Sequence, residues 1–164
     1  MPDTVIEMQN AYSETLQLAA KDEADLEVVS ALLQDAIIAG ADMHFDAPNF
    51  CFMIVADRFC WERQALPGVN TSNGGQVRER VLCGLRFRDV VDVRKSQWPA
   101  NWRNSFFNIL ALKSVPVPQQ HSGCVMEFSF SGGPALRLTA HRIDLVFGDL
   151  DIGRPTNLQP RHEL

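Results

Sequence analysis

Hydrophobic and polar residues alternate most clearly near the middle of the chain. In the segment "RERVLCGLRFRD", residues 78–89, one face carries Val81, Cys83, Leu85 and Phe87. The other face carries arginine and glycine. Because successive side chains of a strand point to opposite sides of the sheet, this pattern predicts a strand with one buried face.

The same period of two recurs in "CVMEFSFSGGPALRLTA", residues 124–140, on either side of a Gly132–Gly133 turn. The pattern predicts a β-hairpin. Its predicted inward residues are Cys124, Met126, Phe128, Phe130, Leu136, Leu138 and Ala140. Farther along the chain the predicted inward residues are Ile143, Leu145 and Phe147, which have odd instead of even numbers. A one-residue slip reverses the faces, so a break is predicted at His141–Arg142.

Shorter apolar runs predict further strands. Residues 43–45 and 50–61 read as two strands around the turn "DAPN", in which proline and asparagine favour a turn. Residues 90–98 follow the central strand closely enough to be its hairpin partner, and residues 106–115 form one more strand. At the start of the pattern, residues 15–20 alternate Leu16, Leu18 and Ala20 and predict a first strand.

One segment, residues 21–40, has the period of a helix. Asp22 is a suitable N-cap, and acidic residues follow it in the first turn, where the helix dipole favours negative charge. The apolar stripe consists of Leu26, Val29, Leu33, Ala36 and Ile37. Gly40 is expected to end the helix as the residue after its C-cap.

These elements predict an α+β domain made mostly of antiparallel β-structure, with one amphipathic helix near the N-terminus. About seven to eight short strands are expected, in two packed sheets or a partly open barrel. A pleckstrin-homology-like barrel is one such arrangement. The expected organisation is a flexible arm over residues 1–14, a single domain over 15–151 and a loose tail over 152–164.

Charge is distributed unevenly. The net charge is −5, yet residues 1–50 hold ten Asp and Glu against a single Lys21, so the rest of the chain is positive. The acidic N-terminus lacks the features of a signal peptide, and no apolar run is long enough for a membrane span. The expected location is the cytoplasm, where the four cysteines stay reduced.

The residues from 43 to 64 contain metal-ligating types close together in the sequence. Cys51 and Cys60 lie nine residues apart, so in a straight strand they are roughly 30 Å apart, and they face opposite sides. His44, Asp46 and Cys51 converge only in one hairpin register, the one that pairs Asp46 with Cys51. We therefore expect buried thiols on a hairpin, with no metal site and no cofactor.

Sequence signals for catalysis are weak. The chain has no nucleophile elbow and no glycine-rich nucleotide fingerprint. His141 lies at the predicted break, where a side chain can be re-aimed toward a site. An enzyme with dispersed site residues His44, Asp46 and His141 stays as an alternative, and no catalytic residue is assigned.

A basic and aromatic stretch gives the clearest candidate for binding. Arg80, Arg86 and Arg88 share strand parity, and Trp98 and Trp102 follow. Such a face can bind phosphate or a single-stranded nucleic acid. It can equally be the solvated side of an ordinary sheet, and the acidic overall charge favours this second interpretation.

Several segments resemble a family of small, mostly proteobacterial proteins classed as a domain of unknown function. The resembling segments are "DLEVVSALLQDAI", "RFCWE", "RVLCGLRF" and "GGPALRLTAHRIDLVFGDL". Typical members carry aspartate before the tryptophan of "RFCWE", where this chain has Cys60. The resemblance implies a stand-alone cytosolic bacterial protein with no established activity, and it supplies no site residue.

Taken together, these features predict a non-catalytic binding or protein–protein interaction module. Its expected partner is a protein or a small ligand, and a homodimer is one form that stays open. Nucleic acid and membrane are not expected as partners. The alternatives are the dispersed enzyme and a weak phosphate or nucleic-acid binder on the arginine face.

Overall fold

The computed structural model describes residues 15–62, 78–120 and 122–156. The elements before the first gap are β1 (Gln17–Ala20), α2 (Glu23–Leu33), β2 (Ile37–Ala39), η1 (Gly40–Asp42), β3 (Met43–Asp46), η2 (Ala47–Asn49) and β4 (Cys51–Phe59). Those after it are β5 (Arg78–Phe87), β6 (Val90–Ser96), η3 (Trp102–Asn104), β7 (Phe106–Val115), β8 (Cys124–Phe130), β9 (Ala135–Ala140), β10 (Leu145–Asp149) and β11 (Arg154–Thr156).

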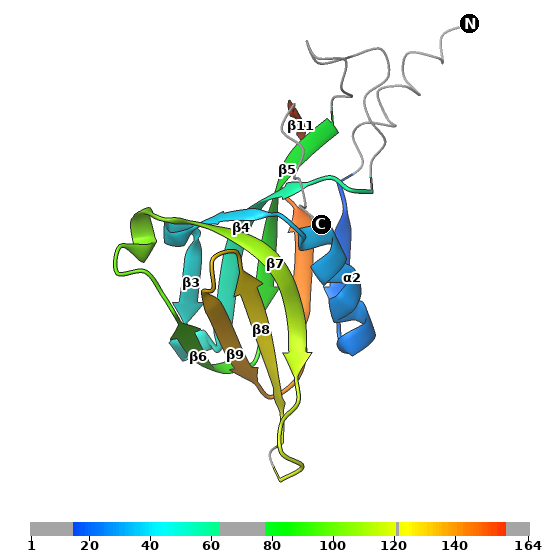
Figure 1. Cartoon of the computed structure of the whole chain (residues 1–164). Coiled ribbons are helices and arrows are strands. Elements are labelled where there is room, and N and C mark those ends of the chain that lie inside the picture. Colours follow the sequence, from blue (N-terminus) through cyan, green and yellow to red (C-terminus); the bar gives the residue numbers. More distant parts are fainter. Residues whose placement is uncertain (1–14, 63–77, 121, 157–164) are drawn as a thin grey trace, which may run out of the picture.

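The strands of the described residues form one open antiparallel sheet with eleven members. Its main path runs β1-β10-β5-β4-β2-β7-β8-β9-β6, while β11 pairs with β5 and β3 pairs with β4. The expected class, mostly antiparallel β-structure with one helix, is confirmed. The expectation of two packed sheets was wrong, and so was the count of seven to eight strands. Figure 1 shows how strongly the single sheet curves.

The three-residue strand β2 explains why there is one sheet. It pairs with β4 on one side and with β7 on the other, so it joins the two groups of strands that the sequence pattern separates. Its residues Ile37 and Ile38 were predicted to continue the helix. Both are β-branched, and they suit a strand better than a helix.

The helix begins as predicted. The backbone N–H of Asp25 donates to the side chain of Asp22 at 2.8 Å, which makes Asp22 the N-cap. The helix ends earlier than expected, at Leu33, and Asp35 follows with a left-handed φ of 65°. Gly40 therefore does not terminate the helix, as predicted, and its role lies elsewhere in the fold.

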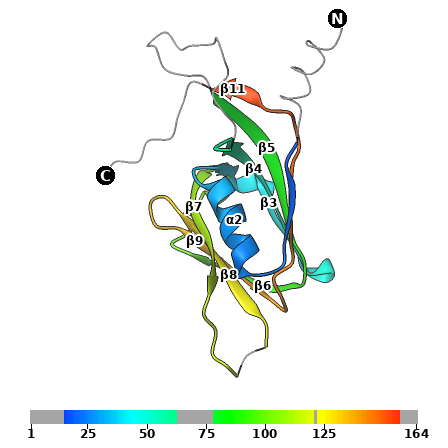
Figure 2. The ribbon, with the colours of Figure 1, turned by 90° about the vertical axis from the view of Figure 1, so that its right-hand side faces the viewer.

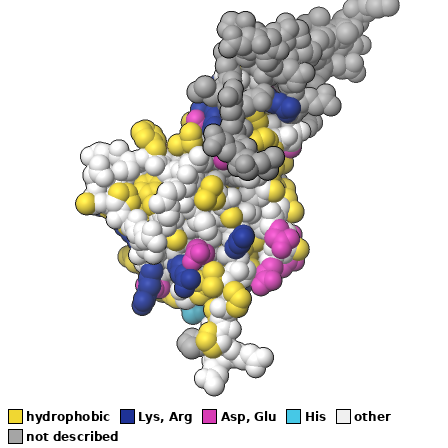
Figure 3. Space-filling view, in the orientation of Figure 1, with side chains coloured by type: hydrophobic (Ala, Val, Ile, Leu, Met, Phe, Trp, Pro, Cys, Tyr) yellow, Lys and Arg dark blue, Asp and Glu magenta, His cyan; other side chains and the backbone are white. Residues whose placement is uncertain are grey.

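The helix packs against the inside of the curved sheet, in contact with β7, β1 and β4. Figure 2 shows α2 lying between the strands of the two halves of the sheet. Leu26, Val29 and Leu33 are buried in this contact and join one continuous hydrophobic core. Figure 3 shows acidic side chains gathered at the edge that α2 forms.

Strand faces follow the predicted alternation closely. Val81, Cys83, Leu85 and Phe87 on β5 are all buried. The hairpin of β8 and β9 also has the predicted inward face, with Cys124 at its end half-buried. The predicted break at His141–Arg142 is confirmed, because β9 ends at Ala140 and β10 begins only at Leu145.

The predicted partner of β6 was wrong. β6 pairs with β9, although it follows β5 directly in the chain. Asp89, between β5 and β6, has a left-handed φ of 58°. The chain therefore turns away from β5 at this point, and β6 becomes the last strand of the sheet path.

The predicted arm of residues 1–14 and residues 157–164 of the predicted tail lie outside the described residues. Within the predicted tail, β11 pairs with β5 through Arg154, Pro155 and Thr156. In the described part of the chain, no helix has the length and apolar character needed to cross a membrane.

Candidate binding site

A cavity of about 200 Å³ lies between the strand pair β3–β4 and the strand pair β6–β9. It is lined by Met43, Phe45, Phe52, Val93, Lys95, Trp98, Trp102 and Leu136. In the described sheet β3 pairs only with β4 and β6 pairs only with β9, so β3 and β6 each have a second edge that no described strand covers. We call this cavity the slot.

Two backbone hydrogen bonds join segments next to the slot. The N–H of Val90, at the start of β6, donates to the carbonyl of Phe50, between η2 and β4, at 2.9 Å, and so ties β6 to the turn that follows β3. The N–H of Gly40, the first residue of η1, donates to the carbonyl of Ser105 at 2.8 Å. This second tie extends the pairing of β2 with β7 and brings η1 next to η3.

Gly40 is required by the second of these ties. A Cβ atom at this position would lie 1.8 Å from the carbonyl oxygen of Trp102. Only glycine permits such a close approach of the backbones. The glycine therefore holds η3, and with it Trp102, against the turn that precedes β3.

The tryptophans of the slot are packed against the core. The ring of Trp98 stacks on Phe107, with centroids 4.5 Å apart, and meets Phe130 edge-on at 5.9 Å. The ring of Trp102 lies 6.4 Å from that of Trp98. Both tryptophans remain half-buried, so the slot combines a fixed aromatic wall with aromatic surface that solvent still reaches.

Two cations surround Trp102. The Lys95 Nζ atom lies 4.0 Å from the centroid of the Trp102 ring and 5.8 Å from that of Trp98. The Arg103 Cζ atom lies 5.0 Å from the Trp102 centroid. Contacts of this length are cation–π interactions. Neither cation forms an ion pair with a carboxylate of the described residues.

One buried donor beside the slot lacks a partner. The Nε1 atom of Trp98 is shielded from solvent and has no hydrogen-bond acceptor within the described ranges. Leaving a buried donor unsatisfied typically costs about 1–3 kcal/mol. Trp61 differs, because its Nε1–H donates to the carbonyl of Gln34 at 2.9 Å.

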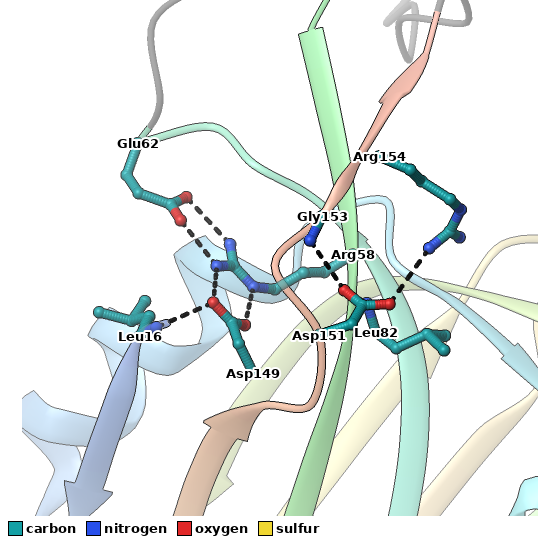
Figure 4. A network of polar contacts seen from close by, with 8 residues as sticks. All are labelled: Leu16, Arg58, Glu62, Leu82, Asp149, Asp151, Gly153 and Arg154. Atoms are coloured by element: carbon teal, nitrogen blue, oxygen red, sulfur yellow. Dashed lines mark hydrogen bonds and ion pairs between the residues drawn. The ribbon is translucent and has the colours of Figure 1, made fainter. Parts of the chain in front are cut away.

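A buried polar cluster outside the slot surrounds Arg58 of β4 (Figure 4). Its guanidinium donates twice to Asp149 of β10, at 2.9 Å each, and the Arg58 and Asp149 side chains are both 0% exposed. It donates twice more to Glu62, at 2.9 and 2.7 Å. The backbone N–H of Leu16 also donates to Asp149, at 3.0 Å. We call this group the arginine network.

Burial alone would lower the pKa of the Arg58 guanidinium. The hydrogen bonds and charges of Glu62 and Asp149 outweigh burial and raise that pKa above its ordinary value. The guanidinium also lies 5.6 Å from the ring centroid of Phe147. The network ties β1, β4 and β10 together, and its Arg58 stays charged at every ordinary pH.

A third polar cluster surrounds Asp144, just before β10. Its side chain is 2% exposed and pairs with Lys21 at 2.6 Å and with Arg88 at 3.0 Å. Burial would raise the pKa of this carboxyl, but the hydrogen bonds and charges of the two cations lower it below its ordinary value. Arg142 lies 3.5 Å away on the same carboxylate.

Burial makes two of the thiols less reactive. None of the four cysteines forms a disulfide, and burial raises the pKa of Cys83 to about 12 and the pKa of Cys124 above its ordinary value. A thiol is a nucleophile or metal ligand only as the thiolate. Within the described segments, no group of three or more His, Cys, Asp or Glu side chains is placed to hold a metal ion.

The structure separates the residues of the predicted basic face. Arg80 donates to the carbonyl of Asp57 at 3.1 Å, Arg88 pairs with Asp144, and Arg86 is exposed between Met53 and Val146 on the neighbouring strands. None of these arginines lines the slot. By contrast, Trp98 and Trp102 meet there, as part of one site.

The enzyme alternative names His44, Asp46 and His141, and in the described residues no hydrogen bond joins any two of them. His44 and Asp46 lie on β3, and Asp46 accepts a hydrogen bond from Asn49 at 2.8 Å. Asp46 does pair with Cys51 across the hairpin, in the register considered from the sequence. The His141 backbone N–H donates to the carbonyl of Asp89 at 3.0 Å.

Sequence reasoning missed Arg58 and Asp149, although their positions carried a signal. Arg58 has the same parity as the inward residues Ile54 and Ala56, and Asp149 has that of Leu145 and Phe147. Charged residues at inward positions of two strands indicate a buried ion pair, because isolated buried charges are too costly to persist.

Comparison with known proteins identifies a family for the chain but no activity. No curated protein and no solved structure matches it. A family described as a protein of unknown function, DUF2948, matches residues 16–162. The resemblance to a domain of unknown function is thereby confirmed, and the chain belongs to the DUF2948 family.

Proposed function

We propose that this protein is a binding module that takes up a small planar apolar group in the slot between β3 and β6. The observation that carries the proposal is a cavity of about 200 Å³ walled by half-buried aromatic rings. An apolar cavity of about 150 Å³ is sufficient for benzene. The slot therefore suits one ring or two fused rings.

The wall of the slot favours a flat ligand. Phe45, Trp98 and Trp102 each keep part of their surface in contact with solvent. A planar group inserted among them would remove this apolar surface from water and would add ring–ring contacts, which contribute roughly 0.5–1.5 kcal/mol per pair beyond burial.

The slot is suited to binding rather than to chemistry. Among the described residues that line it, Lys95 is the only titratable side chain. A single ammonium without an adjacent base or nucleophile does not form a general acid–base pair. The small-ligand form of the interaction module is thus favoured over the dispersed enzyme, whose residues His44, Asp46 and His141 lie outside the slot.

The proposal is tested by titrating the protein with 2-naphthamide, a neutral two-ring probe, in a calorimeter. A ligand of this size with ordinary efficiency binds with a Kd of about 1 mM or tighter. We expect Trp102→Ala to weaken binding at least about tenfold, because it removes one wall of the slot. Trp61→Ala is the matched control, since Trp61 packs on Phe59 elsewhere and should leave the Kd unchanged.

A second variant guards against misfolding of Trp102→Ala. Val93→Phe adds volume to the slot at a half-buried position and should block the probe while the fold remains. Circular dichroism monitors the fold of each variant. Binding that survives both substitutions, or no binding of the probe to the wild-type protein, would overturn the proposal.

A further inference from the structure

We infer that the natural ligand of the slot is an aromatic carboxylate, whose ring lies among the tryptophans and whose carboxylate meets Lys95. This inference rests on the proposed function and names the chemical class of the ligand.

Lys95 and Arg103 differ from most of the described cations. Those in ion pairs include Lys21, Arg58, Arg88, Arg94, Arg137, Arg142 and Arg154. Arg94, the neighbour of Lys95 on the same strand, pairs with Asp92 at 3.0 Å. Lys95 instead holds its ammonium over the ring of Trp102, at the wall of the slot.

The electrostatic consequence is a positive wall in a protein of net charge −5. Two cations lie within 5.0 Å of the Trp102 centroid, and no described carboxylate neutralises either of them. A neutral or cationic ligand would leave this charge uncompensated. An anionic group beside the ring would compensate it, and in a partly desolvated site the attraction exceeds its value in water.

The donors favour a carboxylate over a phosphate. Phosphate sites in proteins are commonly built from a helix N-terminus, a nest of backbone N–H groups or the fork of an arginine. The residues lining the slot supply one charged donor, the ammonium of Lys95, and none of them is an arginine. This modest set suits a single carboxylate attached directly to an aromatic ring.

The test compares 2-naphthoate with 2-naphthamide, which has nearly the same shape and no charge. We expect the wild-type protein to bind the acid about tenfold more tightly at low salt, a ratio that corresponds to about 1.4 kcal/mol. The ratio should shrink at 0.5 M salt, because exposed charges are screened. Lys95→Met keeps the apolar stem of the side chain and should bring the two Kd values together.

Lys113→Met is the matched control, since Lys113 is an exposed lysine of β7 that does not line the slot. It should leave the preference for the acid intact. Equal binding of acid and amide by the wild-type protein, or a preference that Lys95→Met retains, would overturn the inference while leaving the proposed function standing. Failure of both probes to bind would overturn the proposed function as well.

Discussion

The arginine network and the slot place cations in opposite situations. Arg58 is completely buried and gives its hydrogen bonds to two carboxylates of the same chain. Lys95 and Arg103 are exposed, lie on an aromatic ring and have no carboxylate partner in the described residues. The first arrangement uses the charge to hold strands together. The second leaves charge available to a molecule from outside.

The difference between the two sites separates charged side chains that stabilise the fold from charged side chains that the fold does not need. A buried charge persists when its partners satisfy it, and its removal is expected to damage the fold. An exposed cation contributes little to stability, since even an exposed ion pair is worth about 0–1 kcal/mol. An exposed cation on an aromatic ring gains about 0.5–1 kcal/mol from the cation–π contact, and under the proposal made above it also meets the ligand.

The largest expected effect is the loss of stability when the arginine network is broken. Arg58→Met leaves the buried Asp149 carboxylate without its cation, so the free energy of unfolding should fall by about 3–5 kcal/mol. Urea denaturation measures this change. Arg94→Met, which breaks the exposed pair with Asp92, should stay within about 0.5 kcal/mol.

A double replacement sharpens this prediction. Arg58→Met with Asp149→Leu removes both charges and should recover part of the stability that Arg58→Met loses, because no buried charge then remains unpaired. If Arg58→Met destabilised the protein no more than Arg94→Met does, the network would not be the structural element described above.

A smaller effect on stability, combined with a loss of binding, is expected at the tie beside the slot. In Gly40→Ala the new Cβ clashes with the carbonyl of Trp102, so η3 must move away from the turn before β3. We expect a cost of about 1–3 kcal/mol in urea denaturation, together with weaker binding of 2-naphthamide.

The control is Gly84→Ala, whose Cβ would meet only the side chain of Leu150, at 3.5 Å. This contact is ordinary, so stability and binding should both be preserved. A Gly40→Ala protein that binds 2-naphthamide as tightly as the wild type does would show that the tie does not shape the slot.

The smallest effect concerns pH and the Asp144 cluster. The pKa of the Asp144 carboxyl is lowered in the folded state, so the unfolded chain binds more protons as the pH falls. The stability that this group contributes is present above the ordinary pKa of aspartate, near pH 4, and is lost as the pH falls through the lower folded value.

Urea midpoints measured from pH 6 to pH 3 test this prediction. In Asp144→Asn the decline of the midpoint toward low pH should be shallower than in the wild-type protein. Asp92→Asn, at an exposed ion pair, is the control and should keep the wild-type slope. An unchanged slope in Asp144→Asn would contradict the role given to the cluster.

The parts of the fold that the sequence predicted are those in which one face of a long strand is buried. β5 and β8 alternate because one side meets the core and the other does not, and this difference is local. β2 and β11 have three residues each, which is too short for a period to appear. The partner of β6 depends on a contact with β9, far along the chain, which no local pattern encodes.

The candidate site was predictable to a similar extent. Trp98 and Trp102 stand out in the sequence beside a basic stretch, and the structure does bring them together. The slot itself requires β3 to lie opposite them, which follows from the curvature of the whole sheet. The arginines at 80, 86 and 88 were more conspicuous than Lys95, yet Lys95 is the cation that lines the slot.

The most direct test of a ligand site in the slot is to record the indole N–H signals of the three tryptophans in a ¹⁵N-labelled sample. On titration with 2-naphthamide, the signals of Trp98 and Trp102 should move together, while the signal of Trp61, whose N–H is held by Gln34, should stay in place. Binding that moves the Trp61 signal and leaves those of Trp98 and Trp102 unchanged would contradict the account.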